Sequence, residues 1–167
     1  RDDVRELQES GIDGSGINVA VIDLPFSTVH YELKDSLAKY TNCDDNGSVH
    51  FNGIVVATKL CGKDLGVAPG CSLHFYGTGV GVINTVRDTL KSLKDIYEQN
   101  KNGANIRIVS MSSTLHREKP ECKEICQKLI SQGCYIIDSE IFNRDFTCIN
   151  QDVNTKENEA KKLLNNF

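Results

Sequence analysis

The sequence feature that most constrains the fold is the apolar run at residues 19–22, which ends in the carboxylate of Asp23. A short continuous apolar segment of this kind is typical of a strand that is buried on both faces, as the strands of parallel sheets are. In open α/β sheets, ligands and catalytic groups gather at the carboxyl ends of the strands. Asp23 is therefore either a functional acid at that edge or an acid that only caps the next turn.

The rest of the chain alternates short apolar segments with longer amphipathic ones. We expect helices over residues 2–9, 82–99, 119–132 and 156–167, and strands over residues 17–22, 73–76, 106–111 and 134–137. Residues 53–60 are apolar enough for a buried helix, although periodicity alone leaves a strand open. The polar residues 40–50 predict an exposed loop. This alternation predicts one domain over residues 1–167, a three-layer α/β fold with a mostly parallel sheet flanked by helices.

Charge and hydropathy exclude two classes of partner. The 167 residues carry a net charge of −4 with acids and bases interleaved, and the absence of a basic stripe argues against nucleic acid. No apolar stretch approaches the roughly 20 residues that cross a bilayer, so we expect no membrane partner.

The cysteines indicate a reducing compartment. Their number is odd and their spacing irregular, which favours free thiols in the cytoplasm over a secreted disulfide framework: Cys43, Cys61, Cys71, Cys122, Cys126, Cys134 and Cys148. Cys122 and Cys126 lie four residues apart in an expected helix, so they are either two metal ligands or two buried small side chains. Because no second close pair completes a zinc site, we expect no metal and no cofactor.

Four segments, taken in order, resemble the subtilisin-like serine peptidases. Residues 14–23 (GSGINVAVID) are similar to the family's glycine turn, strand and catalytic Asp, and residues 30–33 (HYEL) to its His-Pro-Asp-Leu. Residues 52–58 (NGIVVAT) and 66–73 (GVAPGCSL) are similar to its histidine-bearing helix and the turn that follows. Residues 106–112 (IRIVSMS) are similar to its substrate-lining strand.

The resemblance covers about residues 1–143 and implies the N-terminal part of a subtilisin-like fold. It implies that Asp23 is the acid of a catalytic triad and that Ser110, Ser112 and Ser113 lie along bound substrate. It places Asn143 at the position of the amide that stabilises the oxyanion.

The sequence departs from the resembling family at the catalytic base and at the nucleophile. Asn52 occupies the position of the family's histidine, and an amide cannot accept the proton of a serine hydroxyl near neutral pH. His50, two residues upstream, is either a substitute base or a solvent-facing loop histidine. No segment matches the turn that carries the family's nucleophilic serine.

Three functional hypotheses follow. The first is a subtilisin-like domain without catalytic activity that binds a peptide, a partner protein or another lobe of the same protein. The second is a portion of an active subtilisin-like serine endopeptidase whose serine-bearing half lies outside this chain. The third is a nucleotide-binding domain, suggested by the glycines of residues 77–81. An exposed edge of a sheet that ends early would also favour an oligomer.

Overall fold

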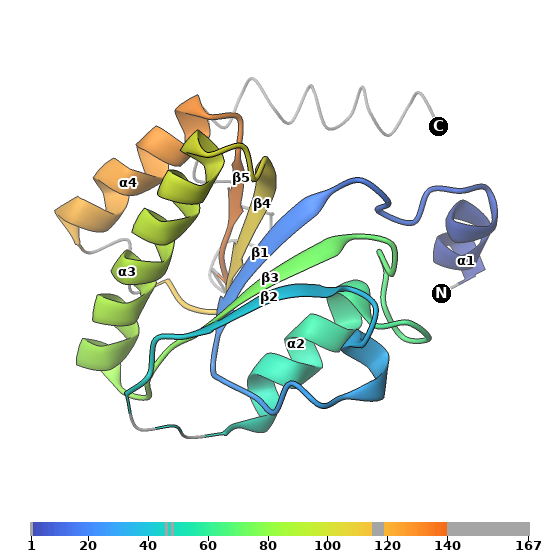
Figure 1. The fold of residues 1–167 in the computed structure, drawn as a ribbon, viewed down its shortest axis with the longest axis horizontal. Coiled ribbons are helices and arrows are strands. Elements are labelled where there is room, and N and C mark those ends of the chain that lie inside the picture. Colours follow the sequence, from blue (N-terminus) through green and yellow to red (C-terminus); the bar gives the residue numbers. More distant parts are fainter. Residues whose placement is uncertain (1, 46, 48, 115–118, 140–167) are drawn as a thin grey trace.

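The computed structural model describes residues 2–45, 47, 49–114 and 119–139, and it shows a parallel five-stranded sheet between helices (Figure 1). The strand order is β2-β3-β1-β4-β5, and every neighbouring pair is parallel. The strands are β1 (Asn18–Asp23), β2 (Leu37–Asn42), β3 (Ser72–Gly77), β4 (Ile106–Met111) and β5 (Tyr135–Ile137). Strand β1 therefore lies at the centre, with β3 and β4 on either side.

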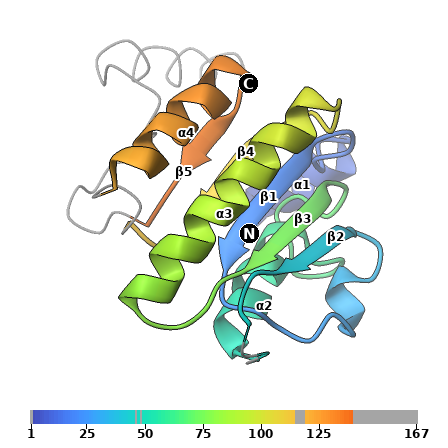
Figure 2. The ribbon, with the colours of Figure 1, turned by 60° about the vertical axis from the view of Figure 1, so that its left-hand side comes forward.

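Helices cover both faces of this sheet. The helices are α1 (Asp2–Glu9), α2 (Phe51–Cys61), α3 (Val82–Lys101) and α4 (Pro120–Ser131), with a short 3-10 helix, η1 (Tyr31–Leu33). Helices α3 and α4 pack side by side on one face, and α2 packs on the other (Figures 1 and 2). The expectation of a three-layer α/β fold with a parallel sheet is confirmed.

Strand β1 explains why the apolar run was continuous. Val19 and Val21 belong to the core between the sheet and α2, whereas Ala20 and Ile22 belong to the core beneath α3 and α4. Successive side chains of a strand point to opposite faces, so a strand that is buried on both sides needs apolar residues at every position. The run predicts the central strand for this reason.

Most expected elements match the structure within one or two residues. Residues 53–60 belong to a helix, α2, which settles the choice that periodicity left open. The strand expected over residues 17–22 runs over Asn18–Asp23, so Asp23 is its last residue rather than the residue after it. The helix expected over residues 156–167 lies outside the described residues, as do Asn143 and Cys148.

The prediction of a loop over residues 40–50 is wrong at its beginning. Strand β2 continues to Asn42 and pairs with β3, with Tyr40 opposite Phe75. The Tyr40 hydroxyl accepts a hydrogen bond from the Phe26 amide at 3.0 Å and donates one to the Phe26 carbonyl at 2.9 Å. The polar residues of β2 are tolerated because it is the edge strand of the described sheet, with one side free of a neighbour.

The described cysteines are all buried and free: Cys43, Cys61, Cys71, Cys122, Cys126 and Cys134. Burial raises the pKa of the Cys122 thiol, and it raises the pKa of the Cys126 thiol to about 12. Both therefore remain protonated in the core beneath α4. Among the described residues, no three His, Cys, Asp or Glu side chains come together as metal ligands would.

No helix in the described part of the chain combines the length and the apolar character that crossing a membrane requires.

Candidate functional site

A cavity of ≈ 310 Å³ opens at the carboxyl end of the central strands. Its walls from the ends of β1 and β4 are Ile22, Asp23, Leu24, Met111, Ser112 and Ser113. Its walls from the helix side are Asn52, Thr78, Gly81, Val82, Thr85 and Thr89. Strands β3 and β4 lie on opposite sides of β1. After β1 the chain passes through β2 and α2 to reach β3, and it then crosses through α3 to reach β4 on the other side. Such a reversal of strand order is where open α/β sheets bind ligands.

The Asp23 carboxylate accepts hydrogen bonds from three donors in this cavity. Its Oδ1 accepts from the Leu24 amide at 2.6 Å and from Asn52 Nδ2 at 2.8 Å, and its Oδ2 accepts from the Ser112 hydroxyl. Asp23 is buried, and a buried carboxylate requires hydrogen-bond donors to offset its loss of hydration. Asp23 therefore ties the ends of β1, α2 and β4 together.

Asn52 reaches Asp23 because α2 begins unusually close to the chain that leaves β1. A Cβ at Gly53 would lie 1.9 Å from the Leu24 carbonyl oxygen, so no other residue fits there without a shift. The His50 amide donates to the Pro25 carbonyl at 2.8 Å, which fixes the entry to the same helix. Glycine at position 53 thus sets the distance between Asn52 and Asp23.

His50 does not take part in the cavity. It precedes the first residue of α2, and its side chain makes no capping hydrogen bond. Its Nε2 atom is buried without a hydrogen-bond partner, and the residue is not among those that line the cavity. The structure therefore gives no support to His50 as a base beside Asp23.

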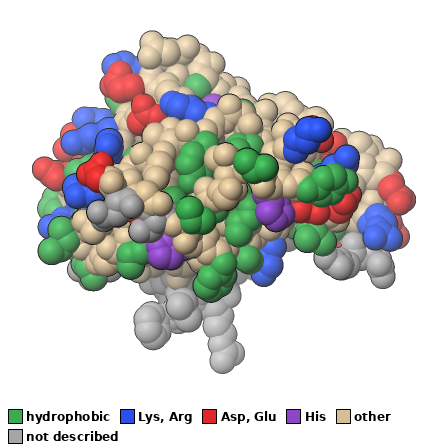
Figure 3. Space-filling model, turned by 60° about the horizontal axis from the view of Figure 1, so that its bottom comes forward, with side chains coloured by type: hydrophobic (Ala, Val, Ile, Leu, Met, Phe, Trp, Pro, Cys, Tyr) green, Lys and Arg blue, Asp and Glu red, His purple; other side chains and the backbone are tan. Residues whose placement is uncertain are grey.

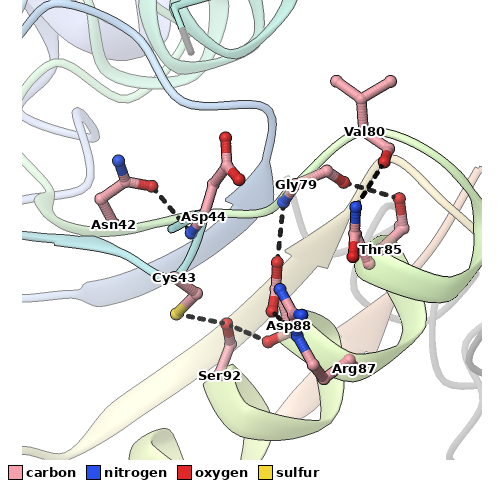
Figure 4. Close-up of polar contacts among 10 residues, drawn as sticks. Asn42, Cys43, Asp44, Gly79, Val80, Thr85, Arg87, Asp88 and Ser92 are labelled. Carbon is pink, nitrogen blue, oxygen red and sulfur yellow. Dashed lines mark hydrogen bonds and ion pairs between the residues drawn. The ribbon is translucent and has the colours of Figure 1, made fainter. Parts of the chain in front are cut away.

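The loop between β3 and α3 is held in place from α3 (Figure 4). Asp88 is fully buried and accepts from the Gly79 amide at 2.8 Å and from Arg87 Nε at 2.8 Å. The Thr85 hydroxyl donates to the Gly79 carbonyl at 2.9 Å, so both polar groups of the Gly79 backbone are paired. The hydrogen bond to Asp88 in turn raises the pKa of the Arg87 guanidinium.

A second layer of contacts supports Asp88 from below (Figure 4). The Ser92 hydroxyl donates to the Asp88 carbonyl at 2.7 Å, and the Cys43 sulfur lies 3.6 Å from the Ser92 oxygen. Burial raises the pKa of the Cys43 thiol, which keeps it protonated and able to donate to Ser92. The wall of the cavity formed by the β3–α3 loop is therefore built on buried polar contacts.

We expect replacement of Asp88 by alanine to lower the free energy of unfolding by about 2–3 kcal/mol. The change leaves the buried Gly79 amide without an acceptor, and an unsatisfied buried donor costs its full desolvation. Urea denaturation followed by circular dichroism measures the loss. Glu98→Ala, on the same helix, is the control, because its exposed pair with Lys101 contributes less than about 1 kcal/mol. Equal stability of the two variants would show that Asp88 does not anchor the loop.

The structure brings together some of the residues proposed from sequence. Asp23, Asn52, Ser112 and Ser113 all line the cavity, whereas Ser110 pairs within the sheet and does not. Sequence reasoning missed the contribution of α3, which supplies Val82, Thr85 and Thr89. The glycines of residues 77–81, directly before α3, were the sequence feature that could have indicated this part of the cavity wall.

The cavity offers neutral hydrogen-bonding groups. Among the lining residues that the structure describes, Asp23 is the one ionisable side chain, and none is His, Cys, Lys or Arg. A phosphate would also need free backbone donors at the glycines of residues 77–81, but the Gly79 amide is already bound to Asp88. The arrangement suits a ligand with neutral donors and acceptors rather than a nucleotide.

The fold and this cavity define an α/β domain with a cavity at the carboxyl edge of a parallel sheet. No family model matches the chain. Solved structures that share its fold include two that are named as proteases. The structure of the prenylagaramide maturation protease PagA matches with a TM-score of 0.62 at 18% identity, over 81% of this chain and 49% of that one. A lanthipeptide protease matches with a TM-score of 0.53 at 14% identity, over 80% of this chain and 42% of that one.

These comparisons correct the assignment to the subtilisin-like serine peptidases. The structures that match are a prenylagaramide maturation protease and a lanthipeptide protease, and identities of 18% and 14% show a shared fold and no more. The quoted segments are short, and each marks a strand, turn or helix start that this fold requires in any case. The assignment to that family is therefore wrong, as are both functions that it implied, the inactive subtilisin-like domain and the portion of an active subtilisin-like endopeptidase.

Proposed function

We propose that this chain has a peptidase-like role in which the cavity at the carboxyl edge of the sheet binds a peptide segment. The observation that carries the proposal is the cavity itself, with the Asp23 carboxylate, the Asn52 amide and the Ser112 hydroxyl at one end of the central strands. Peptide bonds present neutral donors and acceptors, which match these groups.

The fold comparisons support the peptide as the class of ligand. One neighbouring structure is named a prenylagaramide maturation protease and the other a lanthipeptide protease. The present chain spans about half the length of each, 49% and 42%. The proposal therefore concerns peptide binding by this part of the fold.

Binding of a labelled peptide pool tests the proposal. We expect a pool of random, fluorescein-labelled dodecapeptides to show saturable binding by fluorescence anisotropy. Ser113→Trp, which fills the cavity from the end of β4, should weaken that binding by about tenfold or more, equivalent to about 1.4 kcal/mol. Mass spectrometry of the incubated pool reports whether the protein cleaves the peptides, and whether the Ser113→Trp variant no longer does so.

Ser131→Trp is the matched control for this experiment. Ser131 is the last residue of α4, away from the residues that line the cavity, so the added indole should leave binding unchanged. Circular dichroism establishes that both variants are folded. Absence of binding by the unmodified protein, or equal binding by a folded Ser113→Trp variant, would contradict the proposal.

A further inference from the structure

Large exposed apolar side chains lie next to cavity-lining residues at the starts of α2 and α3. Phe51 is 80% exposed at the start of α2, and Ile83 is 83% exposed at the start of α3. Val55 in α2, Val82 at the start of α3 and Val80 in the loop before α3 are also exposed. We call these five residues the apolar mouth. Figure 3 views the molecule from the side where α2 and α3 begin, and there hydrophobic side chains gather while most charged ones lie toward the margins.

The pattern along α3 is inverted near the cavity. A surface helix ordinarily buries apolar residues and exposes polar ones. Here Asp88, Thr89 and Ser92 are buried, whereas Val82 and Ile83 in the first turn are exposed. Hydrogen bonds to the Gly79 amide and within α3 account for the burial of Asp88 and Ser92, whereas the exposure of Val82 and Ile83 is not explained by such contacts. Exposed apolar clusters beside a cavity mark binding surfaces.

The charge of the site also limits what the mouth accepts. Asp23 is the one ionisable group among the described lining residues, and its oxygens already accept from Leu24, Asn52 and Ser112. The described lining contains no Lys, Arg or His side chain that could pair with an acidic ligand. The Asp23 carboxylate already accepts from three neutral donors, so it does not require a basic ligand. Apolar residues such as Ile22, Val82 and Met111 form much of the remaining wall. An uncharged peptide with apolar side chains therefore fits both the neutral polar groups of the cavity and the apolar residues around them.

We propose that the cavity and the apolar mouth select peptide segments rich in large aliphatic or aromatic side chains, one of which enters the cavity. The volume of ≈ 310 Å³ lies at the small end of ligand pockets, which span about 300–1,000 Å³, so it suits one residue rather than a folded element. The flanking peptide residues cover Phe51 and Ile83. This inference rests on the proposed function and names the class of peptide that the site takes.

A set of matched synthetic peptides tests the selection. Fluorescein-labelled dodecapeptides of Gly and Ser carry Leu, Phe, Ser, Lys or Glu at three alternate central positions, because alternate residues of an extended peptide share a face. We expect the Leu and Phe peptides to bind at least about tenfold more tightly than the other three in fluorescence anisotropy, a difference of about 1.4 kcal/mol. Equal affinities, or tighter binding of the Lys or Glu peptide, would overturn the inference.

Substitutions in the apolar mouth test whether these residues cause the preference for apolar peptides. Val82→Asp should abolish the preference for Leu and Phe, and an acid in the first turn of a helix is compatible with folding. Val67→Asp is the matched control, since Val67 is similarly exposed but precedes β3 at the opposite end of the sheet. A preference that survives Val82→Asp would contradict the assignment to the mouth.

The two proposals fail in different ways. If no peptide of the random pool binds, the proposed function itself is wrong. If peptides bind through a cavity that Ser113→Trp blocks, but without preference for apolar residues, the peptide-binding function stands and the selection inferred here is wrong.

Discussion

The Gly53→Ala variant is expected to lose about 3 kcal/mol of its free energy of unfolding. An added methyl group would lie 1.9 Å from the Leu24 carbonyl oxygen and 2.9 Å from Phe75 Cζ, so α2 must move away from β1. Overpacking of this kind costs about 1–3 kcal/mol and more where backbone atoms are displaced. In an open helix the same change would stabilise the protein by about 1 kcal/mol, so the expected sign is opposite to helix propensity.

Thermal and urea denaturation followed by circular dichroism measure the effect of this substitution. Lys59→Ala, at an exposed position of the same helix, is the control and should change the free energy of unfolding by less than about 0.5 kcal/mol. The displacement of α2 also moves Asn52 from Asp23, so peptide binding should weaken together with stability. A Gly53→Ala variant as stable as the original protein would show that the close approach of α2 is not required.

The central strand and the long helices could be predicted from sequence because their burial leaves a local pattern. Strand β1 is buried on both faces, which gives a continuous apolar run, and α3 repeats apolar residues with the period of a helix. The position of Asp23 at the carboxyl end of the sheet followed from the same run. A buried element constrains each of its residues, and that constraint is visible in one sequence.

Strand β2 and the polar wall of the cavity could not be predicted in this way. Strand β2 is stabilised by pairing with β3 and by the contacts of Tyr40 with Phe26, which are distant in sequence. Asp88 has the sequence pattern of a solvent-exposed helix residue, yet it is buried against Gly79. Contacts of this kind depend on tertiary structure, and no local periodicity reports them.

The family assignment failed for a related reason. Residues 66–69 read Gly-Val-Ala-Pro, and residues 52–58 lie in the first turns of a helix that follows a loop, as in the resembling family. Such segments record where strands, turns and helices begin, so they are informative about the fold and weakly informative about chemistry. The site had to be assessed from the contacts of Asp23, Asn52 and Ser112 instead.

Those contacts make Asp23→Ala the second substitution with a large expected effect. The change removes the acceptor of the Leu24 amide, the Asn52 amide and the Ser112 hydroxyl at once. Hydrogen bonds to a charged group contribute about 1.5–3 kcal/mol each, and partial rescue by water at the open cavity reduces their sum. We expect the free energy of unfolding to fall by about 3–4 kcal/mol, measured by urea denaturation, and peptide binding to fall below detection.

Two further variants separate the charge of Asp23 from its shape. Asp23→Asn keeps the side-chain volume and one acceptor oxygen, which can still accept from Leu24 and Asn52, but its amide nitrogen cannot accept from the Ser112 hydroxyl. We therefore expect about half of the loss seen with alanine. Ser112→Ala removes one donor and leaves the carboxylate with the other two, so it should cost about 1–2 kcal/mol. Equal stability of all three variants (Asp23→Ala, Asp23→Asn and Ser112→Ala) and the original protein would contradict a role of the Asp23 carboxylate in joining β1, α2 and β4. A graded loss in the expected order would show that the same hydrogen bonds that shape the cavity also hold its three walls together.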